Sequence, residues 1–130
     1  MIRPCYLVLD REYPGSISTR KLVIETAKLN VITAYDVQEA IETLERFPRV
    51  DGVVFNASIV GISTEQMIQR LRQIVPEITV IITSAGTPRR DLENEYYVDS
   101  LDPKALLDCL ESLNKQAMKE IAKRDPEINQ

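Results

Sequence analysis

The chain of 130 residues contains no histidine, no tryptophan, two cysteines and four glycines. Without histidine, catalysis and metal binding by an imidazole are both excluded. Two cysteines are too few for a disulfide framework or a zinc site. We expect Cys5 and Cys109 to be small buried side chains in a reducing cytoplasm. The polar segment 10–15 after the first apolar run has neither a G-x-G-x-x-G motif nor a P-loop, which argues against a nucleotide binder.

Charge and hydropathy narrow the class of protein further. The net charge of −4 argues against nonspecific binding to nucleic acid. No apolar run approaches the roughly 20 residues that a membrane helix requires. The apolar fraction of 44% and the charged fraction of 28% are ordinary for a soluble globular protein. We therefore expect one domain over residues 1–124 that contacts no membrane, followed by a frayed polar tail at 125–130.

Five short apolar segments alternate with segments of helical periodicity. The apolar segments predict strands at 6–9, 31–34, 53–55, 78–82 and 96–98. The intervening segments begin with capping residues: Asp36, Ser63 in a capping box with Gln66, and Asp102 before Pro103. This pattern predicts an α/β fold, a flavodoxin-like doubly wound parallel sheet of five strands in the order 2-1-3-4-5 with helices on both faces.

Two of the predicted helices depart from the regular pattern. The segment 89–95 is polar and lacks apolar periodicity, so we expect a shortened fourth helix of one or two turns there. The last helix is extended, because apolar residues recur at helical spacing for about five turns. These residues are Leu106, Leu110, Leu113, Ala117 and Ile121.

A doubly wound sheet carries its functional pocket where strands 1, 3 and 4 end. The side chains expected at that edge are polar: Asp10, Arg11, Glu12, Asn56, Thr83 and Ser84. Asn56 follows the central strand, where a reactive group is expected. An amide is uncharged, a weak nucleophile and no general base, so this position lacks the reactivity that its place predicts.

The residues at this edge and their order resemble a response-regulator receiver domain over about residues 5–113. That family has an acidic pair after strand 1, a phosphorylated Asp after strand 3, Thr or Ser after strand 4, and Lys-Pro after strand 5, with an aromatic switch residue three places before the Lys. Asp10, Arg11 and Glu12 match the acidic segment, with Arg11 in the second acidic place. Asn56 falls at the acceptor place, Ser84 at the hydroxyl place, Tyr97 at the aromatic place, Ser100 at the Lys place and Leu101 at the Pro place.

The resemblance with these departures implies a degenerate receiver of bacterial two-component signalling. It implies no phosphoryl acceptor, a lost Mg²⁺ site, no other cofactor and no enzymatic activity. The expected role is a cytoplasmic protein-interaction module. It binds a signalling partner or a second copy through its last strands and helices, with Leu113, Ala117 and Ile121 as the candidate interface.

Other interpretations remain open for the whole chain and for single residues. The chain could be a receiver phosphorylated at an unusual residue, Asp10 or Ser84, or a small flavodoxin-like enzyme or nucleotide binder. Asp10 can be a surface carboxylate beside Arg11, and Asn56 can simply satisfy backbone groups at the strand end. Ser84 can bond a neighbouring carbonyl, and Tyr97 can be a packing residue. Asp51 and Asp99 lie at the wrong ends or faces of strands to replace the acceptor, although Asp99 is the nearer.

Overall fold

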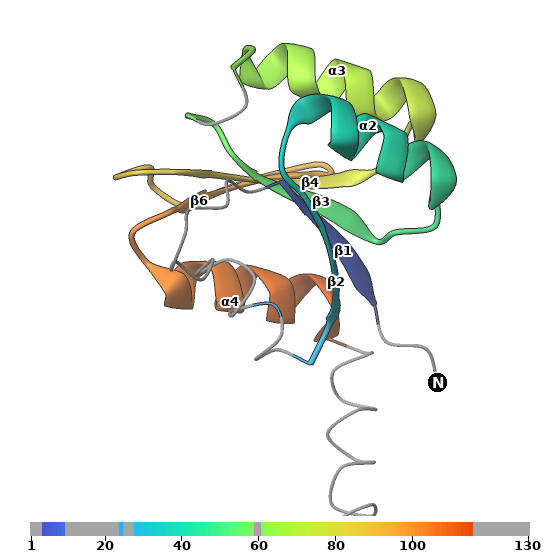
Figure 1. Ribbon diagram of the computed structural model, residues 1–130. Helices are drawn as coiled ribbons and strands as arrows, with labels where there is room; N and C mark the ends of the chain where they lie inside the picture. The colour runs from blue at the N-terminus through green and yellow to red at the C-terminus, as the bar shows by residue number, and fades with distance from the viewer. Residues whose placement is uncertain (1–3, 10–23, 25–27, 59–60, 116–130) are drawn as a thin grey trace, which may run out of the picture.

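The computed structural model describes residues 4–9, 24, 28–58 and 61–115 (Figure 1). The strands are β1 (Cys5–Leu9), β2 (Asn30–Ala34), β3 (Gly52–Asn56), β4 (Thr79–Ser84), β5 (Arg90–Leu92) and β6 (Glu95–Asp99). The helices are α2 (Val37–Arg46), α3 (Thr64–Ile74) and α4 (Pro103–Leu113). Among the described residues, no helix has the length and apolar character needed to span a membrane.

The six strands form one sheet in the order β2-β1-β3-β4-β6-β5. The first five in that order pair in parallel and reproduce the predicted strand order 2-1-3-4-5. The central strands are continuously apolar because both faces of the sheet are covered, and Val53, Val54 and Phe55 are completely buried. The fold class predicted from the sequence is therefore confirmed.

Helices α2 and α3 cover one face of the sheet (Figure 1). The caps form as the sequence predicts: the Asp36 carboxylate accepts the backbone N–H of Glu39 at 2.7 Å. Ser63 and Gln66 exchange both hydrogen bonds of the capping box. The buried positions recur at helical spacing: Ala40, Ile41 and Leu44 on α2, and Met67, Ile68 and Leu71 on α3.

Helix α4 covers the opposite face (Figure 1), where Ile24 and Leu29 are also buried. It begins as predicted, because the Asp102 carboxylate accepts backbone N–H groups of the first turn and Pro103 occupies the first helical position. At its far end, the Asn114 amide donates to the Tyr6 hydroxyl at 2.7 Å and so joins α4 to β1. Beyond Lys115, the predicted last helix and the tail lie outside the described residues, as does most of the segment between β1 and β2.

The expected short fourth helix is wrong: part of that segment forms β5, antiparallel to β6. Arg90 and Leu92 alternate with Asp91, the period of a strand, and Arg90 pairs with Tyr97. Asn94 closes the hairpin in the left-handed conformation (φ 59°), which asparagine tolerates better than most residues. Arg72 of α3 then donates to the Asn94 carbonyl at 3.1 Å, which fixes the turn against the helix layer.

Candidate functional site at the carboxyl edge of the sheet

The strand register brings several of the predicted site residues together. Asn56 at the end of β3 pairs with Thr83 of β4, and Ser84 pairs with Asp99 of β6. Ser100 follows, and its backbone N–H donates to the Ser84 carbonyl at 3.1 Å. These residues form a polar row along the carboxyl ends of β3, β4 and β6. We call it the carboxyl-edge row.

The acidic segment lies outside the described residues. Asp10, Arg11 and Glu12 directly follow β1, whose last residue Leu9 pairs with Phe55, the neighbour of Asn56. The chain therefore enters the segment 10–12 beside the carboxyl-edge row. The positions of the three side chains relative to Asn56 stay a prediction.

Asn56 uses its side chain locally. Its Oδ1 atom accepts the backbone N–H of Ser58 at 2.9 Å and the Ser58 hydroxyl at 2.6 Å. This is an Asx-turn, in which the side chain orders the chain as it leaves the strand. Asn56 therefore satisfies a backbone group at the strand end, and its place as the acceptor equivalent stays a prediction. Its amide oxygen is committed to these bonds, and an amide supplies no nucleophile for phosphoryl transfer.

Thr83 and Ser84 place their hydroxyls in different surroundings. Thr83 is buried, and its hydroxyl lies 3.5 Å from the Phe55 carbonyl, a weak contact. Ser84 is half-buried, and its hydroxyl has no hydrogen-bond partner among the residues that the structure describes. The Ser84 backbone carbonyl is the anchor instead, because it accepts N–H groups from Thr87 and Ser100. Ser84 and the equally half-buried Ser100 are thus the residues of the row whose hydroxyls form no hydrogen bond within the described part of the chain.

The carboxylate of Asp99 has a structural function that the sequence did not predict. Its Oδ1 atom accepts the backbone N–H of Gly86 at 3.0 Å and that of Leu101 at 2.9 Å. One carboxylate therefore joins the loop after β4 to the loop after β6. Gly86 makes this turn in the left-handed conformation (φ 73°), which glycine adopts without strain. Asp51, the other carboxylate considered, lies at the opposite edge and accepts the N–H of Cys5.

Tyr97 on β6 contacts both the hydrophobic core and the neighbouring strand β5. Its ring packs against the core on the α2–α3 face, and the Arg90 guanidinium lies 5.9 Å from the ring centroid. Its hydroxyl lies 3.4 Å from a Glu95 oxygen, and Glu95 forms an ion pair with Arg72 at 2.9 Å. Burial, followed by the Glu95 charge, raises the pKa of the Tyr97 phenol. These contacts fit the packing interpretation of Tyr97.

The described parts of the chain offer no metal centre built from protein ligands. Within residues 4–9, 24, 28–58 and 61–115, no three side chains of the His, Cys, Asp or Glu type gather closely enough to hold a metal ion. Cys109 is completely buried, and burial raises the pKa of its thiol to about 11. Cys5 is only half-buried. The prediction of two buried cysteines is therefore confirmed for Cys109 and true in part for Cys5.

The candidate interface on the last helix is described only at its first residue. Leu113 is half-buried and packs against the core cluster that contains Tyr6, Leu106 and Leu110. Ala117 and Ile121 lie outside the described residues. Two large apolar side chains in other places between β5 and α4 are also exposed: Leu101 after β6 is 74% exposed, and Leu92 on β5 is 40% exposed. The part of the chain from β5 to α4 therefore presents apolar surface to solvent.

Comparison with known proteins finds similarity in structure and none in sequence. No protein-family model matches the chain, and no curated protein matches it. A response-regulator receiver protein from Sinorhizobium medicae WSM419 superposes with a TM-score of 0.67 at 17% identity, covering 88% of this chain and 97% of that one. A CheY-like receiver domain protein from Methanospirillum hungatei JF-1 gives 0.65 at 15% identity, covering 92% and 99%.

A third solved structure agrees with these two. The signal receiver domain of an HD domain-containing protein from Pseudomonas fluorescens Pf-5 gives a TM-score of 0.65 at 20% identity, covering 94% of each chain. All three likenesses extend over nearly the whole of both chains, so the similarity concerns the complete domain. The chain therefore has the flavodoxin-like fold that response-regulator receiver domains share.

Proposed function

We propose that this chain is a receiver-type domain of bacterial two-component signalling that acts by binding a protein partner, without accepting a phosphoryl group and without enzymatic activity. The observation that carries the proposal is Asn56. It stands at the carboxyl end of the central strand, where the resemblance places the acceptor, and its amide oxygen is bonded to Ser58. A receiver fold with an amide at that position has the scaffold for signalling and lacks the nucleophile.

Two neighbouring positions support the same proposal. Ser100, at the place of the family's lysine, has no charge with which to balance a phosphoryl group. Asp99, the described carboxylate closest to it in sequence, accepts two backbone N–H groups and holds two loops together. Both bonds use Oδ1, so they hold the carboxylate in an orientation set by the two loops. Arg11 adds a positive charge in the segment where the family holds Mg²⁺, which disfavours a second cation.

A set of variants tests whether the absence of the acceptor, the metal ligand and the counter-cation explains the expected absence of phosphorylation. The single variant Asn56→Asp restores the acceptor, and the triple variant Asn56→Asp, Arg11→Asp, Ser100→Lys also restores the metal ligand and the counter-cation. The double variant Arg11→Asp, Ser100→Lys is the matched control without an acceptor. Each protein is incubated with acetyl phosphate and Mg²⁺ and then weighed intact by mass spectrometry.

We expect only the triple variant to gain one phosphoryl group, because transfer needs nucleophile, metal and cation together. Efficient phosphorylation of the single variant would show that metal and cation are already present. A triple variant that stays unmodified while remaining folded would show that the carboxyl-edge row is not a receiver pocket. Phosphorylation of all four proteins, including the parent, at Ser84 or Asp10 would favour the alternative of an unusual acceptor.

The proposed partner surface is formed by β5, β6 and α4 and continues into the predicted extension of α4 beyond Leu113. Exposed Leu101 and Leu92 lie on this part of the fold, and apolar side chains of this size favour burial in an interface. If the surface mediates self-association, Leu101→Glu shifts the oligomer equilibrium measured by light scattering, and Leu113→Glu with Ile121→Glu has the same effect. Gln69→Glu on exposed α3 adds the same single negative charge as Leu101→Glu and serves as its control. If oligomeric state and partner binding are the same in all variants, this surface is not the interface.

A further inference from the structure

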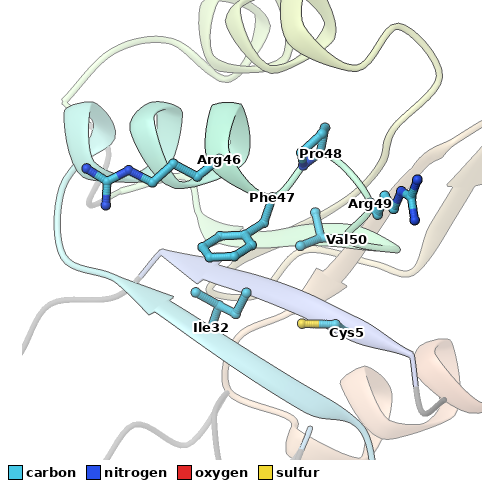
Figure 2. Close-up of a pocket in the computed structure, with 7 residues that line it drawn as sticks. All are labelled: Cys5, Ile32, Arg46, Phe47, Pro48, Arg49 and Val50. Atoms are coloured by element: carbon cyan, nitrogen blue, oxygen red, sulfur yellow. The ribbon is translucent and has the colours of Figure 1, made fainter.

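A cavity of about 340 Å³ lies away from the carboxyl-edge row, toward the amino-terminal ends of β1 and β3 (Figure 2). We call it the α2-end cavity, because the last residue of α2 and the following turn form one wall. Its volume lies at the lower end of the range for small-molecule pockets, roughly 300–1,000 Å³. The site therefore has room for a small organic ligand.

The floor and walls of the α2-end cavity are mainly apolar. Ile32 of β2 and Cys5 of β1 form the floor, and Phe47, Pro48 and Val50 form the wall above them (Figure 2). Phe47 exposes 53% of its surface, although the ring is large and apolar. Covering such a ring with an apolar ligand removes unfavourable contact with water and allows stacking.

Backbone hydrogen bonds fix the conformation of the turn after α2 that forms the wall. The Phe47 N–H caps α2 by donating to the Thr43 carbonyl at 2.9 Å, and the Val50 N–H returns to the Phe47 carbonyl at 3.4 Å. Between them, Pro48 has a restricted φ angle and also restricts the residue before it. Because Val50 is itself buried in the core, the turn is anchored at both ends. The cavity is thus largely formed before any ligand arrives, which lowers the entropic cost of binding.

The polar groups around the cavity are cationic. Arg46 and Arg49 line it, and no acidic side chain does so among the described residues. Both arginines are exposed, and neither forms an ion pair or hydrogen bond with the described part of the chain. Figure 2 shows their guanidinium groups on opposite sides of the Phe47 turn. Exposed arginines change rotamer rapidly, so either group can meet a ligand charge at the rim.

Negative charges near the cavity reduce the effect of its two arginines. The carboxyl end of α2 carries roughly half a negative charge from its unpaired carbonyls. Asp51 follows Val50 in sequence, and its carboxylate is bonded to the N–H of Cys5 at 2.8 Å. Glu42 and Glu45 of α2 are also exposed and precede Arg46 by four residues and one residue, so the positive charge belongs to the lining itself, where Arg46 and Arg49 are the charged side chains. A protein with a net charge of −4 therefore carries a local cationic rim around an apolar cavity.

We propose that the α2-end cavity binds a small amphipathic organic anion, with its apolar body over Ile32 and beside Phe47 and its carboxylate or sulfonate at Arg46 or Arg49. The arginines provide charge-assisted hydrogen bonds to the anionic group, and the apolar floor excludes a strongly hydrated ligand such as inorganic phosphate. The inference does not depend on the proposed function, because the cavity lies at the other end of the sheet from Asn56.

A pair of fluorescent probes tests whether the cavity binds an aromatic ligand and whether it prefers an anionic one. The anion 8-anilinonaphthalene-1-sulfonate and the uncharged N-phenyl-1-naphthylamine share one aromatic skeleton and differ by the sulfonate. We expect the sulfonate probe to bind at one saturable site with a dissociation constant of about 10–100 µM. Arg46→Gln and Arg49→Gln should each weaken the sulfonate probe about two- to fivefold and leave the uncharged probe unchanged. Arg70→Gln, on exposed α3 outside the cavity, is the matched control.

Two experiments locate the bound probe. One is a substitution that fills the cavity, and the other is protection of the Cys5 thiol from alkylation. Ile32→Trp places a large ring over the floor and should abolish saturable binding of both probes, with near-UV circular dichroism to confirm that the fold is retained. In the unaltered protein, bound sulfonate probe should slow alkylation of half-buried Cys5 in proportion to occupancy. Cys109 is completely buried and serves as the internal reference that stays unmodified while the protein is folded.

The measurements distinguish binding in the α2-end cavity from binding elsewhere, and an anionic ligand from an uncharged one. Unchanged binding to folded Ile32→Trp, or unprotected Cys5 at saturating probe, would place the probe elsewhere and overturn the proposed site. Equal affinity for the two probes, with no effect of either arginine substitution, would overturn the assignment to an anionic ligand. Loss of the sulfonate preference in the arginine variants together with protection of Cys5 supports the site and the ligand class.

Discussion

The two hydrogen bonds to Asp99 predict a measurable loss of stability when its carboxylate is removed. A hydrogen bond to a charged group contributes about 1.5–3 kcal/mol. Asp99 is half-buried, so solvent screens both bonds and reduces this contribution. For Asp99→Ala, with the Gly86 and Leu101 N–H groups left without this acceptor, we expect a loss of about 1–3 kcal/mol in the free energy of unfolding. Asp99→Asn keeps an acceptor oxygen and should lose less than half of that.

Urea unfolding followed by far-UV circular dichroism measures this loss, and the thermal midpoint should fall by about 3–6 °C per kcal/mol. Asp108→Ala, on the exposed surface of α4, is the matched control and should stay within about 0.5 kcal/mol of the parent. A stability of Asp99→Ala equal to that of the control would refute the structural role. It would also return Asp99 to the set of carboxylates free to act chemically.

Three further substitutions or conditions have defined outcomes. Gly52→Ala should destabilise the fold by about 1–3 kcal/mol in urea unfolding, because the new Cβ would lie 2.8 Å from the ring of Tyr6 and 3.0 Å from the Thr79 carbonyl; equal stability would contradict this crowding. Arg72→Ala removes the ion pair with Glu95 and should speed amide hydrogen exchange in the β5–β6 hairpin more than in β1, and uniform exchange would argue against local anchoring. Burial raises the pKa of Tyr6 from 10.0 to about 12. Between these pH values the unfolded chain therefore loses the phenolic proton before the folded chain does. The free energy of unfolding should fall by about 2–3 kcal/mol as pH rises from 10 to 12. Tyr6→Phe should flatten that part of the curve, and an unchanged slope would show that another group is responsible.

The parts of the fold that the sequence predicted correctly are those set by local chemistry and periodicity. The caps at Asp36, Ser63 and Asp102 form because each side chain satisfies N–H groups two or three residues ahead. The strands of the parallel sheet could be predicted from the sequence because strands buried on both faces must be apolar throughout. The alternation of strands and helices predicted that the sheet is parallel. The strand order that the resemblance to receiver domains implies agrees with the observed order.

The parts that were missed depend on contacts between distant segments. The β5–β6 hairpin is fixed by Arg72, which is 22 residues before the turn that it contacts, and a single Asn94 without a following glycine is a weak turn signal. The pairing of Asp99 with Gly86 across two loops likewise leaves no local pattern. The α2-end cavity requires residues from β1, β2 and the turn after α2 to meet, which only the folded chain shows. At the candidate site, Asn56 and Ser84 could be placed from strand ends, but the Asn56–Ser58 bonds could not.

The proposed phosphorylation-independent role is tested by the intact mass of the unaltered protein after incubation with acetyl phosphate and Mg²⁺. We expect an unchanged mass, because the amide of Asn56 offers no nucleophile and Asp99 Oδ1 accepts two backbone hydrogen bonds. A receiver domain with an intact acceptor, treated in the same way, is the positive control for the phosphoryl donor. A stoichiometric gain of one phosphoryl group by this chain, wherever peptide mapping places it, would contradict a phosphorylation-independent role.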